Sequence, residues 1–256
     1  MPTPGAGAWW PAGDTDMLLA HLDACGIDQC VVFPPFACQM DQDAVAANRW
    51  AWAEVKAHPD RLLAAGTFNP VAPNALELLH MFHAEGVRQA KIHPSIDRYD
   101  IADPRAAASY GLAADLGIVL DFHTGPHGTR LSMAKPEAFD NAAWDFPKLR
   151  MIFEHMGGRT YFEEFLAIVH NHHGRLMGGL TSVLDQGINR MWYLGPERLT
   201  EAVRISGAGR FVFGLDFPWN SLEKNRSDIA ILQQLDISAE GKAQILGGTL
   251  RALHGI

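Results

Sequence analysis

Three strand-like segments of the chain end in a residue that can bind a metal ion or transfer a proton. Residues 118–122 lead into His123, residues 149–154 lead into His155, and residues 211–215 end at Asp216. Such apolar runs predict buried strands, and a carboxylate at the end of a buried strand needs a partner because burying it unpaired is costly. Three strands that each deliver one ligand-type side chain at the carboxyl end indicate one shared polar site.

Each of these residues also has a simpler interpretation. His123 could be a core histidine bonded to a carbonyl group, His155 could cap the helix that follows it, and Asp216 could cap a turn before Pro218. Because three segments each end in a ligand-type residue, a shared polar site is favoured over three separate structural roles.

Four further residues could contact a substrate. Lys91 and His93 alternate with Ile92, so their side chains share one side of the expected strand. They could bind a substrate carboxylate or form a structural ion pair. His127 and Arg130 follow His123 in a loop and could contact an anionic substrate, although a solvated loop is the simpler interpretation.

The elements that must position these residues alternate regularly between strand and helix. Strands are expected around residues 30, 65, 90, 120, 152, 180 and 212. Regular βα units imply a parallel sheet, either doubly wound or closed as a barrel. No glycine-rich nucleotide-binding turn follows the first strand. Polar residues at the ends of many strands fit the barrel, whose active sites lie at that face.

Helix signals fill the intervals between the strands. Helices are expected over about 14–25, 44–57, 73–86, 104–117, 160–170, 196–205, 228–235 and 238–253, with a longer loop between His123 and residue 149.

Composition limits the class of protein. The 256 residues are 48% hydrophobic and 20% charged, which is typical of a globular domain. A net charge of −8 without any basic run argues against a nucleic-acid or anionic-membrane partner. Residues 1–12 lack the basic and hydrophobic regions of a secretory signal, so none is expected. No apolar run reaches the roughly 18 residues needed to span a bilayer. The three cysteines lack zinc-site spacing and indicate reduced thiols in a cytoplasmic protein.

Five segments together resemble the amidohydrolase-related family, whose members include aminocarboxymuconate-semialdehyde and resorcylate-type decarboxylases. The similarity runs in the family's order from about Asp14 to the C-terminus, and its segments are Lys91–Pro94, Phe122–Gly125, Glu154–Gly158, Phe213–Pro218 and Ile245–Leu253.

This resemblance implies a (β/α)8 TIM barrel with one divalent metal ion. By position, His123 would be a metal ligand, Asp216 a ligand or proton-transfer carboxylate, and His155 a catalytic or metal-proximal histidine. Neutral imidazole and carboxylate groups suit Zn²⁺ or a similar ion, which activates water or polarises a substrate carbonyl or carboxylate.

The chain departs from the family at its start. Family members open with a strand ending in His-x-His or Glu-x-His, but the first histidine here is His21, within an expected helix, and Leu215 stands where the family has serine. We therefore expect an irregular segment over residues 1–13, a single barrel domain over 14–256, and a first strand that is missing or replaced by that segment around Trp9 and Trp10. An open sheet edge would favour association, so a homodimer is possible.

The resemblance implies an enzyme acting on a small molecule. The leading interpretation is a metal-dependent hydrolase of a carboxylated or carbonyl-containing compound. The alternatives are a non-oxidative decarboxylase on the same site, a metal-free lactonase, and a truncated, non-catalytic member. Lys91, His93 and Arg130 are the candidate substrate-binding residues.

Overall fold

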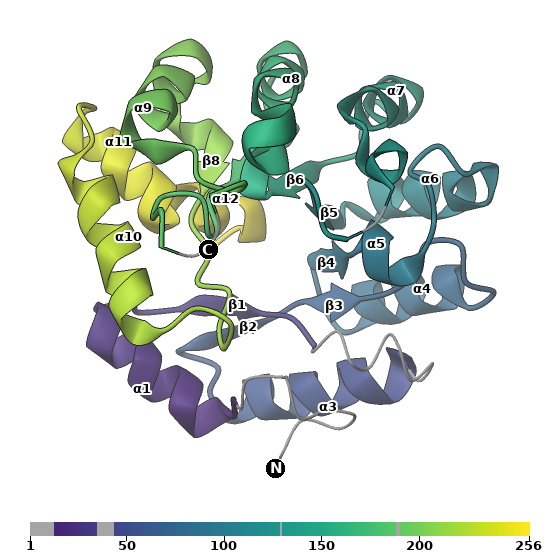
Figure 1. Ribbon diagram of the computed structural model, residues 1–256. Coiled ribbons are helices and arrows are strands. Elements are labelled where there is room, and N and C mark those ends of the chain that lie inside the picture. Colours follow the sequence, from purple (N-terminus) through teal and green to yellow (C-terminus); the bar gives the residue numbers. More distant parts are fainter. Residues whose placement is uncertain (1–12, 35–43, 129, 188–189) are drawn as a thin grey trace.

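The computed structural model describes residues 13–34, 44–128, 130–187 and 190–256. Parallel strands form an inner layer, and helices surround them on the outside (Figure 1). The strands are β1 (Cys30–Val32), β2 (Leu62–Ala64), β3 (Gly66–Thr67), β4 (Gln89–Ile92), β5 (Val119–His123), β6 (Met151–Glu154), β7 (Leu176–Gly179) and β8 (Phe211–Val212).

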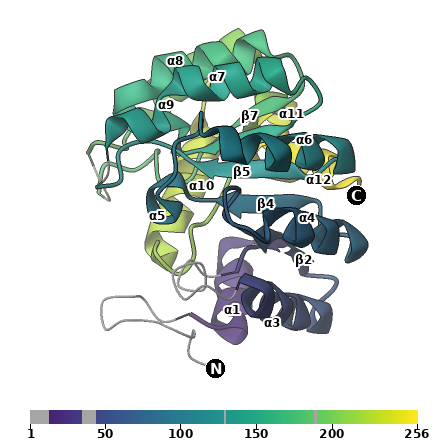
Figure 2. The ribbon, with the colours of Figure 1, turned by 90° about the vertical axis from the view of Figure 1, so that its right-hand side faces the viewer.

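The α-helices alternate with the strands along the chain, and Figure 2 shows their layers from the side. No helix in the described ranges is both long and apolar enough to cross a bilayer. The helices are α1 (Thr15–Cys25), α3 (Ala44–Ala57), α4 (Ala75–Ala84), α5 (Pro94–Asp97), α6 (Ala107–Leu116), α7 (Pro136–Asp145), α8 (Gly158–Asn171), α9 (Gly195–Ser206), α10 (Leu222–Gln234), α11 (Ala239–Ala243) and α12 (Thr249–His254).

The strands occupy the seven positions that the sequence predicts. Strands β3 to β8 pair in chain order, and β1 pairs with β2, all in parallel. Only Ala65 separates β2 from β3, so these two form one strand position that pairs on both sides. Among the described residues no ladder joins β1 to β8. The arrangement confirms the predicted α/β barrel class.

Alternate residues of the strands face two different cores. Outward-facing side chains such as Leu120 and Phe153 pack in the large cluster beneath the helices. The inward-facing residues near the strand starts form a separate small cluster, against which Leu250 and Leu253 of α12 pack. Helix α12 therefore closes the amino-terminal end of the barrel and leaves the carboxyl end for chemistry. The inner cluster consists of Val119, Ile152, Met177 and Val212.

The structure differs from the sequence-based expectation in three elements. The expected loop before residue 149 contains α7, because Pro136 suits a first helical turn and Phe139 and Ala143 bury one face. Helix α10 begins at Leu222, six residues before the expected start, where the Ser221 hydroxyl accepts a hydrogen bond from the Lys224 amide. The expected helix 238–253 is interrupted at Gly247, whose φ is 174°.

Candidate functional site

Polar side chains occupy the inner face toward the carboxyl ends of β4, β5 and β6. Lys91 lies opposite Asp121 in the register of β4 and β5, and His123 lies opposite Glu154 in the register of β5 and β6. His93 directly follows β4. All five residues are buried. The interior above the apolar layer is therefore a polar layer built from adjacent strands.

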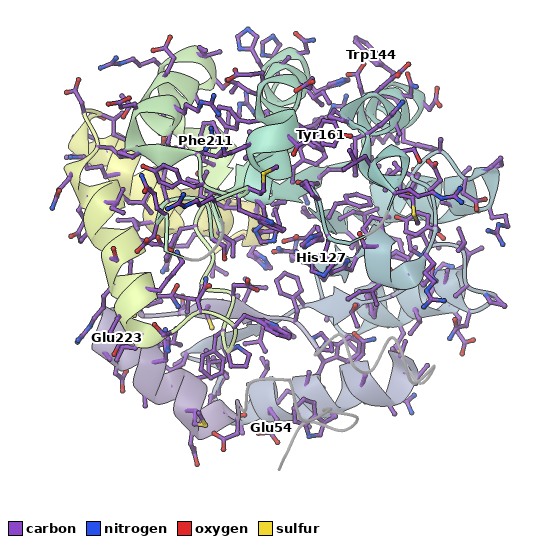
Figure 3. All side chains as sticks on the ribbon, in the orientation of Figure 1. Glu54, His127, Trp144, Tyr161, Phe211 and Glu223 are labelled. Atoms are coloured by element: carbon purple, nitrogen blue, oxygen red, sulfur yellow. The ribbon has the colours of Figure 1, made fainter. Side chains whose placement is uncertain are left out.

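Three histidines meet at the carboxyl end of this polar layer. The rings of His93 and His123 stack with centroids 3.9 Å apart and an interplanar angle of 11°. The ring of His127, which is labelled in Figure 3, lies edge-on to both, with its centroid 4.7 Å from each of the other two. One ring nitrogen of each histidine lies within 4.8 Å of the others. His93 and His123 are buried, whereas His127 is exposed.

The chemistry of this histidine cluster fits a bound metal ion. The Nε2 atom of His123 is buried and has no hydrogen-bond partner in the described part of the chain. Burial lowers the pKa of His123 well below its ordinary value. Burial, followed by the neighbouring His127 and Lys91, lowers the pKa of His93 to about 2. Both rings are thus neutral and offer lone pairs, which is the form that binds Zn²⁺ and similar ions.

His155 approaches the cluster from the end of β6. Its ring centroid lies 4.7 Å from that of His123 and 4.0 Å from that of Trp192. Its Nδ1 atom lies 2.8 Å from the carbonyl oxygen of Thr181. Because a carbonyl oxygen only accepts hydrogen bonds, Nδ1 carries the proton and Nε2 keeps its lone pair. Burial lowers the pKa of His155 well below its ordinary value, so the ring is neutral and offers Nε2 as a ligand or as a weak base.

The backbone that presents His155 is strained and is clamped by Thr124. His155 and Met156 have φ values of 68° and 49°, a region that non-glycine residues rarely adopt. The Thr124 hydroxyl donates to the Glu154 carbonyl at 2.6 Å and accepts from the Gly157 amide at 2.8 Å. Thr124 thus connects the end of β5, which carries His123, to the turn that carries His155.

Lys91 is held as a cation inside the barrel. Its ammonium donates to Asp121 Oδ1 at 2.8 Å, with side-chain exposures of 9% and 1%. Burial acts to lower the pKa of Lys91, but the attraction of Asp121, Glu154 and Asp216 outweighs it, and the pKa is raised. The structure therefore contains the ion pair that was one of the two interpretations of Lys91.

Glu154 is a buried carboxyl group that changes protonation near neutral pH. Burial and then the charge of Asp121 raise its pKa to about 7, against the opposing effect of Lys91. Its Oε2 atom has no hydrogen-bond partner in the described residues. The space beside it exists because residue 179 on β7 is glycine: a Cβ there would lie 2.5 Å from the Glu154 Cδ. Glu154 is suited to general acid–base work.

Asp216 follows β8 at the same end of the barrel. Its φ of 55° turns the chain back after the strand, and its Oδ2 accepts a hydrogen bond from the Ser182 hydroxyl at 3.4 Å. Burial raises the pKa of Asp216, while Lys91 and Ser182 act in the opposite direction. Lys91 thus acts to lower the pKa of both carboxyl groups, Glu154 and Asp216.

The structure brings most of the sequence-predicted residues together. His123 and His155 are in ring contact, and His93 stacks on His123. Asp216 follows β8 at the same end of the barrel, and its side chain contacts Ser182. Arg130 does not join them: it is exposed in the loop after β5, and its side chain forms no hydrogen bond or ion pair with the described site residues. The roles assigned to these residues remain predictions.

Sequence reasoning missed two members of the site. The sequence indicates His127 as a possible contact for an anionic substrate, with a solvated loop as the simpler interpretation, and predicts no metal-binding role for it. It predicts no role for Glu154. The signal for Glu154 was its position directly before His155 at a strand end. His127 lies four residues beyond His123 in a loop, and no periodic pattern shows where such a loop folds.

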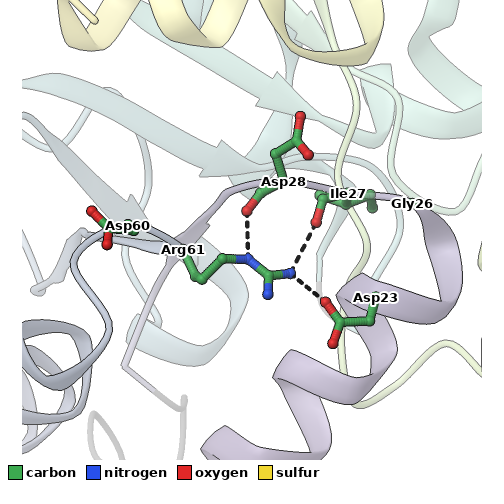
Figure 4. Close-up of a pocket in the computed structure, with 6 residues that line it drawn as sticks. All are labelled: Asp23, Gly26, Ile27, Asp28, Asp60 and Arg61. Carbon is green, nitrogen blue, oxygen red and sulfur yellow. Dashed lines mark hydrogen bonds and ion pairs between the residues drawn. The ribbon is translucent and has the colours of Figure 1, made fainter.

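A surface hollow lies at the amino-terminal end of the barrel, opposite the candidate site, and the contacts of Arg61 account for it (Figure 4). The Arg61 guanidinium donates to the backbone carbonyls of Asp28 and Ile27 at 2.7 and 3.2 Å, and to the Asp23 carboxylate at 2.7 Å. These contacts fasten the loop before β1 to the start of β2. The hollow is lined by Asp23, Gly26, Ile27, Asp28, Asp60 and Arg61.

Comparison with known proteins gives a family match over nearly the whole chain. Residues 11–256 match the family model described as amidohydrolase. No curated protein sequence matches the chain significantly.

Solved structures share the fold at low sequence identity. An uncharacterized TIM-barrel protein from Bordetella bronchiseptica is 20% identical, with a TM-score of 0.76 over 95% of this chain and 84% of that one. An amidohydrolase from Burkholderia multivorans with bound zinc is 14% identical, with a TM-score of 0.73 over 99% and 92%. A 5-carboxyvanillate decarboxylase from Sphingomonas paucimobilis is 16% identical, with a TM-score of 0.71 over 95% and 84%.

Proposed function

The chain belongs to the amidohydrolase family, and on that premise we propose that it is a metal-dependent hydrolase of a small carboxylated or carbonyl-containing molecule. The observation that carries this proposal is the cluster of His93, His123 and His127, whose ring nitrogens lie within 4.8 Å of one another at the carboxyl end of the strands. Active sites of TIM barrels are built at this end.

The three histidines of the cluster would hold the metal ion through neutral imidazoles. Zinc suits such nitrogen ligands, and the amidohydrolase from Burkholderia multivorans contains it. His155 and Asp216 are the further candidate ligands that the family resemblance implies. When bound, a divalent ion would polarise the carbonyl or carboxylate of the substrate.

Proton transfer would fall to Glu154, His155 and Asp216. With a pKa near 7, Glu154 is present in both protonation states at neutral pH and can take a proton and return it. His155 can accept a proton at Nε2, since its Nδ1 proton is engaged by the Thr181 carbonyl. The charge of Lys91 would stabilise the carboxylate forms of Glu154 and Asp216, and a substrate carboxylate is a further partner for it.

Decarboxylation is the second candidate reaction. It is favoured by the shared fold with a 5-carboxyvanillate decarboxylase and by the partly protonated state of Glu154 at neutral pH. In this version Glu154 would donate the proton that replaces the departing CO2. The same residues would serve both reactions, so hydrolysis and decarboxylation must be distinguished by their products.

Two measurements test the proposal. Metal analysis of the purified protein should find about one divalent ion per chain, and its loss to a chelator should abolish turnover. Incubation with a panel of lactones, amides and aromatic carboxylates should then give hydrolysis products without CO2. Release of CO2 from a carboxylate would select decarboxylation, and a protein with neither metal nor turnover would contradict both reactions.

A further inference from the structure

A chain of buried polar side chains runs along the barrel axis from α12 to the candidate site. His254 Nε2 lies 2.9 Å from Gln89 Oε1, Gln89 Nε2 lies 2.8 Å from Asp121 Oδ2, and Lys91 Nζ lies 2.8 Å from Asp121 Oδ1. All four residues are at least nine-tenths buried. They connect the closed end of the barrel to its polar layer.

Hydrogen-bond roles along this chain are fixed by chemistry. The Asp121 carboxylate accepts from Lys91 at one oxygen and from the Gln89 amide nitrogen at the other. With its amide nitrogen committed, Gln89 offers its oxygen to His254, which therefore donates through Nε2. Exchanging the oxygen and nitrogen positions of the Gln89 amide would place its oxygen against the Asp121 carboxylate, where neither group can donate a hydrogen bond. The network thus has one fully satisfied arrangement, which fixes the side chain of Asp121.

Gln89 is the polar exception in an apolar layer. It lies opposite Val119 in the register of β4 and β5, and the neighbouring strands contribute Ile152, Met177 and Val212 at this depth. A buried amide is costly unless its hydrogen bonds are made. An aliphatic side chain would complete the layer, but only a donor at this position can hold the second oxygen of Asp121.

We propose that Gln89 is a positioning residue of the active site: through Asp121 it holds the Lys91 ammonium among the carboxylates of Glu154 and Asp216, and His254 orients Gln89 in turn. This inference rests on the proposed function, because the value of a fixed ammonium lies in the carboxylates that it stabilises. The network also gives α12 a role beyond closing the barrel.

NMR of the Lys91 ammonium tests the positioning directly and needs no turnover. A buried, hydrogen-bonded ammonium exchanges slowly with water, and the described chain buries two lysines, Lys91 and Lys224. Lys224 pairs with Asp228 at 2.7 Å on α10 and serves as an internal reference. In protein labelled with ¹⁵N-lysine, Q89M should shift the Lys91 signal or broaden it beyond detection while the Lys224 signal stays unchanged.

Kinetics of a matched pair of variants completes the test. His254→Gln keeps a donor for the Gln89 oxygen, whereas His254→Leu removes it. We expect Gln89→Met and His254→Leu to lower kcat at least about tenfold with KM changed less than about threefold, and His254→Gln to stay within about threefold of wild type.

An unchanged Lys91 signal in folded Gln89→Met would overturn the proposal, whether or not kcat falls. An altered Lys91 signal with wild-type kcat would also overturn it. A wild-type protein without turnover on any substrate would contradict the proposed function instead, and the Lys91 signal would then decide the positioning alone.

Discussion

The individual residues of the site work in pairs, in which one member creates the conditions for the other. Gly179 leaves the space that Glu154 fills, Asp121 keeps Lys91 charged, and the Thr181 carbonyl sets the tautomer of His155. The partner comes from another strand or loop in each pair. Function at this scale therefore depends on small, specific neighbours as much as on the reactive groups themselves.

Replacing Gly179 with alanine should displace Glu154. The added Cβ would lie 2.5 Å from Glu154 Cδ, so the carboxyl group must move or the strands must separate. We expect kcat/KM to fall at least about tenfold and the free energy of unfolding to fall by about 1–3 kcal/mol. Gly111→Ala is the control, because its Cβ would meet nothing closer than 3.5 Å. Wild-type kinetics in Gly179→Ala would contradict a role for Glu154.

Replacing His127 with alanine should weaken metal binding without affecting the fold, because this histidine is exposed. Removing one of three ligands should lower the affinity for Zn²⁺ at least about tenfold in competition with a chelator. His170→Ala on α8 is the control, since His170 is exposed and lies outside the cluster. Equal zinc affinity in the two variants would remove His127 from the site.

Thr124 offers a stability test of the strained turn. Thr124→Val keeps the shape of the side chain but removes the hydroxyl that bridges the Glu154 carbonyl and the Gly157 amide. The Gly157 amide would lose its partner, whereas the Glu154 carbonyl would keep the bond from the Thr124 amide at 3.2 Å. Urea denaturation should therefore show a loss of about 1–3 kcal/mol. Thr124→Ser retains the hydroxyl and should recover most of this loss. Similar losses in both variants would assign the effect to packing.

At the scale of elements, the C-terminal helix contains a histidine whose contribution to stability depends on pH. Burial, together with the charges of Arg88 and Arg150, lowers the pKa of His254 on α12 from 6.5 to about 4. Between pH 6.5 and about 4, His254 therefore binds a proton in the unfolded chain but not in the folded chain. The contribution of His254 is complete above pH 6.5 and is lost as the pH falls toward 4.

His254→Gln should flatten this pH dependence. Between pH 7.5 and 4 the wild-type protein should lose up to about 3 kcal/mol more of its free energy of unfolding than the variant, because the variant has no group to protonate there. Urea denaturation of both proteins across this range measures the difference, and the other histidines cancel from it. Parallel stability curves would show that His254 titrates normally.

At the scale of the whole molecule, the outer ring contains one more helix than the inner layer has strand positions. The described chain places eight long helices around seven strand positions (Figure 1): α1, α3, α4, α6, α7, α8, α9 and α10. Every residue of β4 to β7 is buried, whereas all three residues of β1 are only partly buried. Within the described residues β1 pairs only with β2 and β8 only with β7, and an open edge between β1 and β8 stays a prediction. The segment expected to fill it, residues 1–12 with Trp9 and Trp10, lies outside the described residues.

Much of this architecture could be predicted from local patterns. Apolar runs with turn residues after them located all seven strand positions, and the residue that ends such a run must lie at one rim of a parallel barrel. His123, His155 and Asp216 were found in this way. The α7 helix was missed because its short apolar face lies within a stretch rich in glycine and proline, and its packing against α8 is a tertiary contact.

The chemical state of the site was decided by the tertiary structure alone. Strand register put Asp121 beside Lys91 and turned a possible substrate contact into a buried ion pair. The fold of the loop after β5 brought His127 to His93 and His123. Desolvation, which depends on everything packed around a group, raised the pKa of Glu154 to about 7. A sequence shows which residues end the strands, but cross-strand partners and loss of water exist only once the chain has folded.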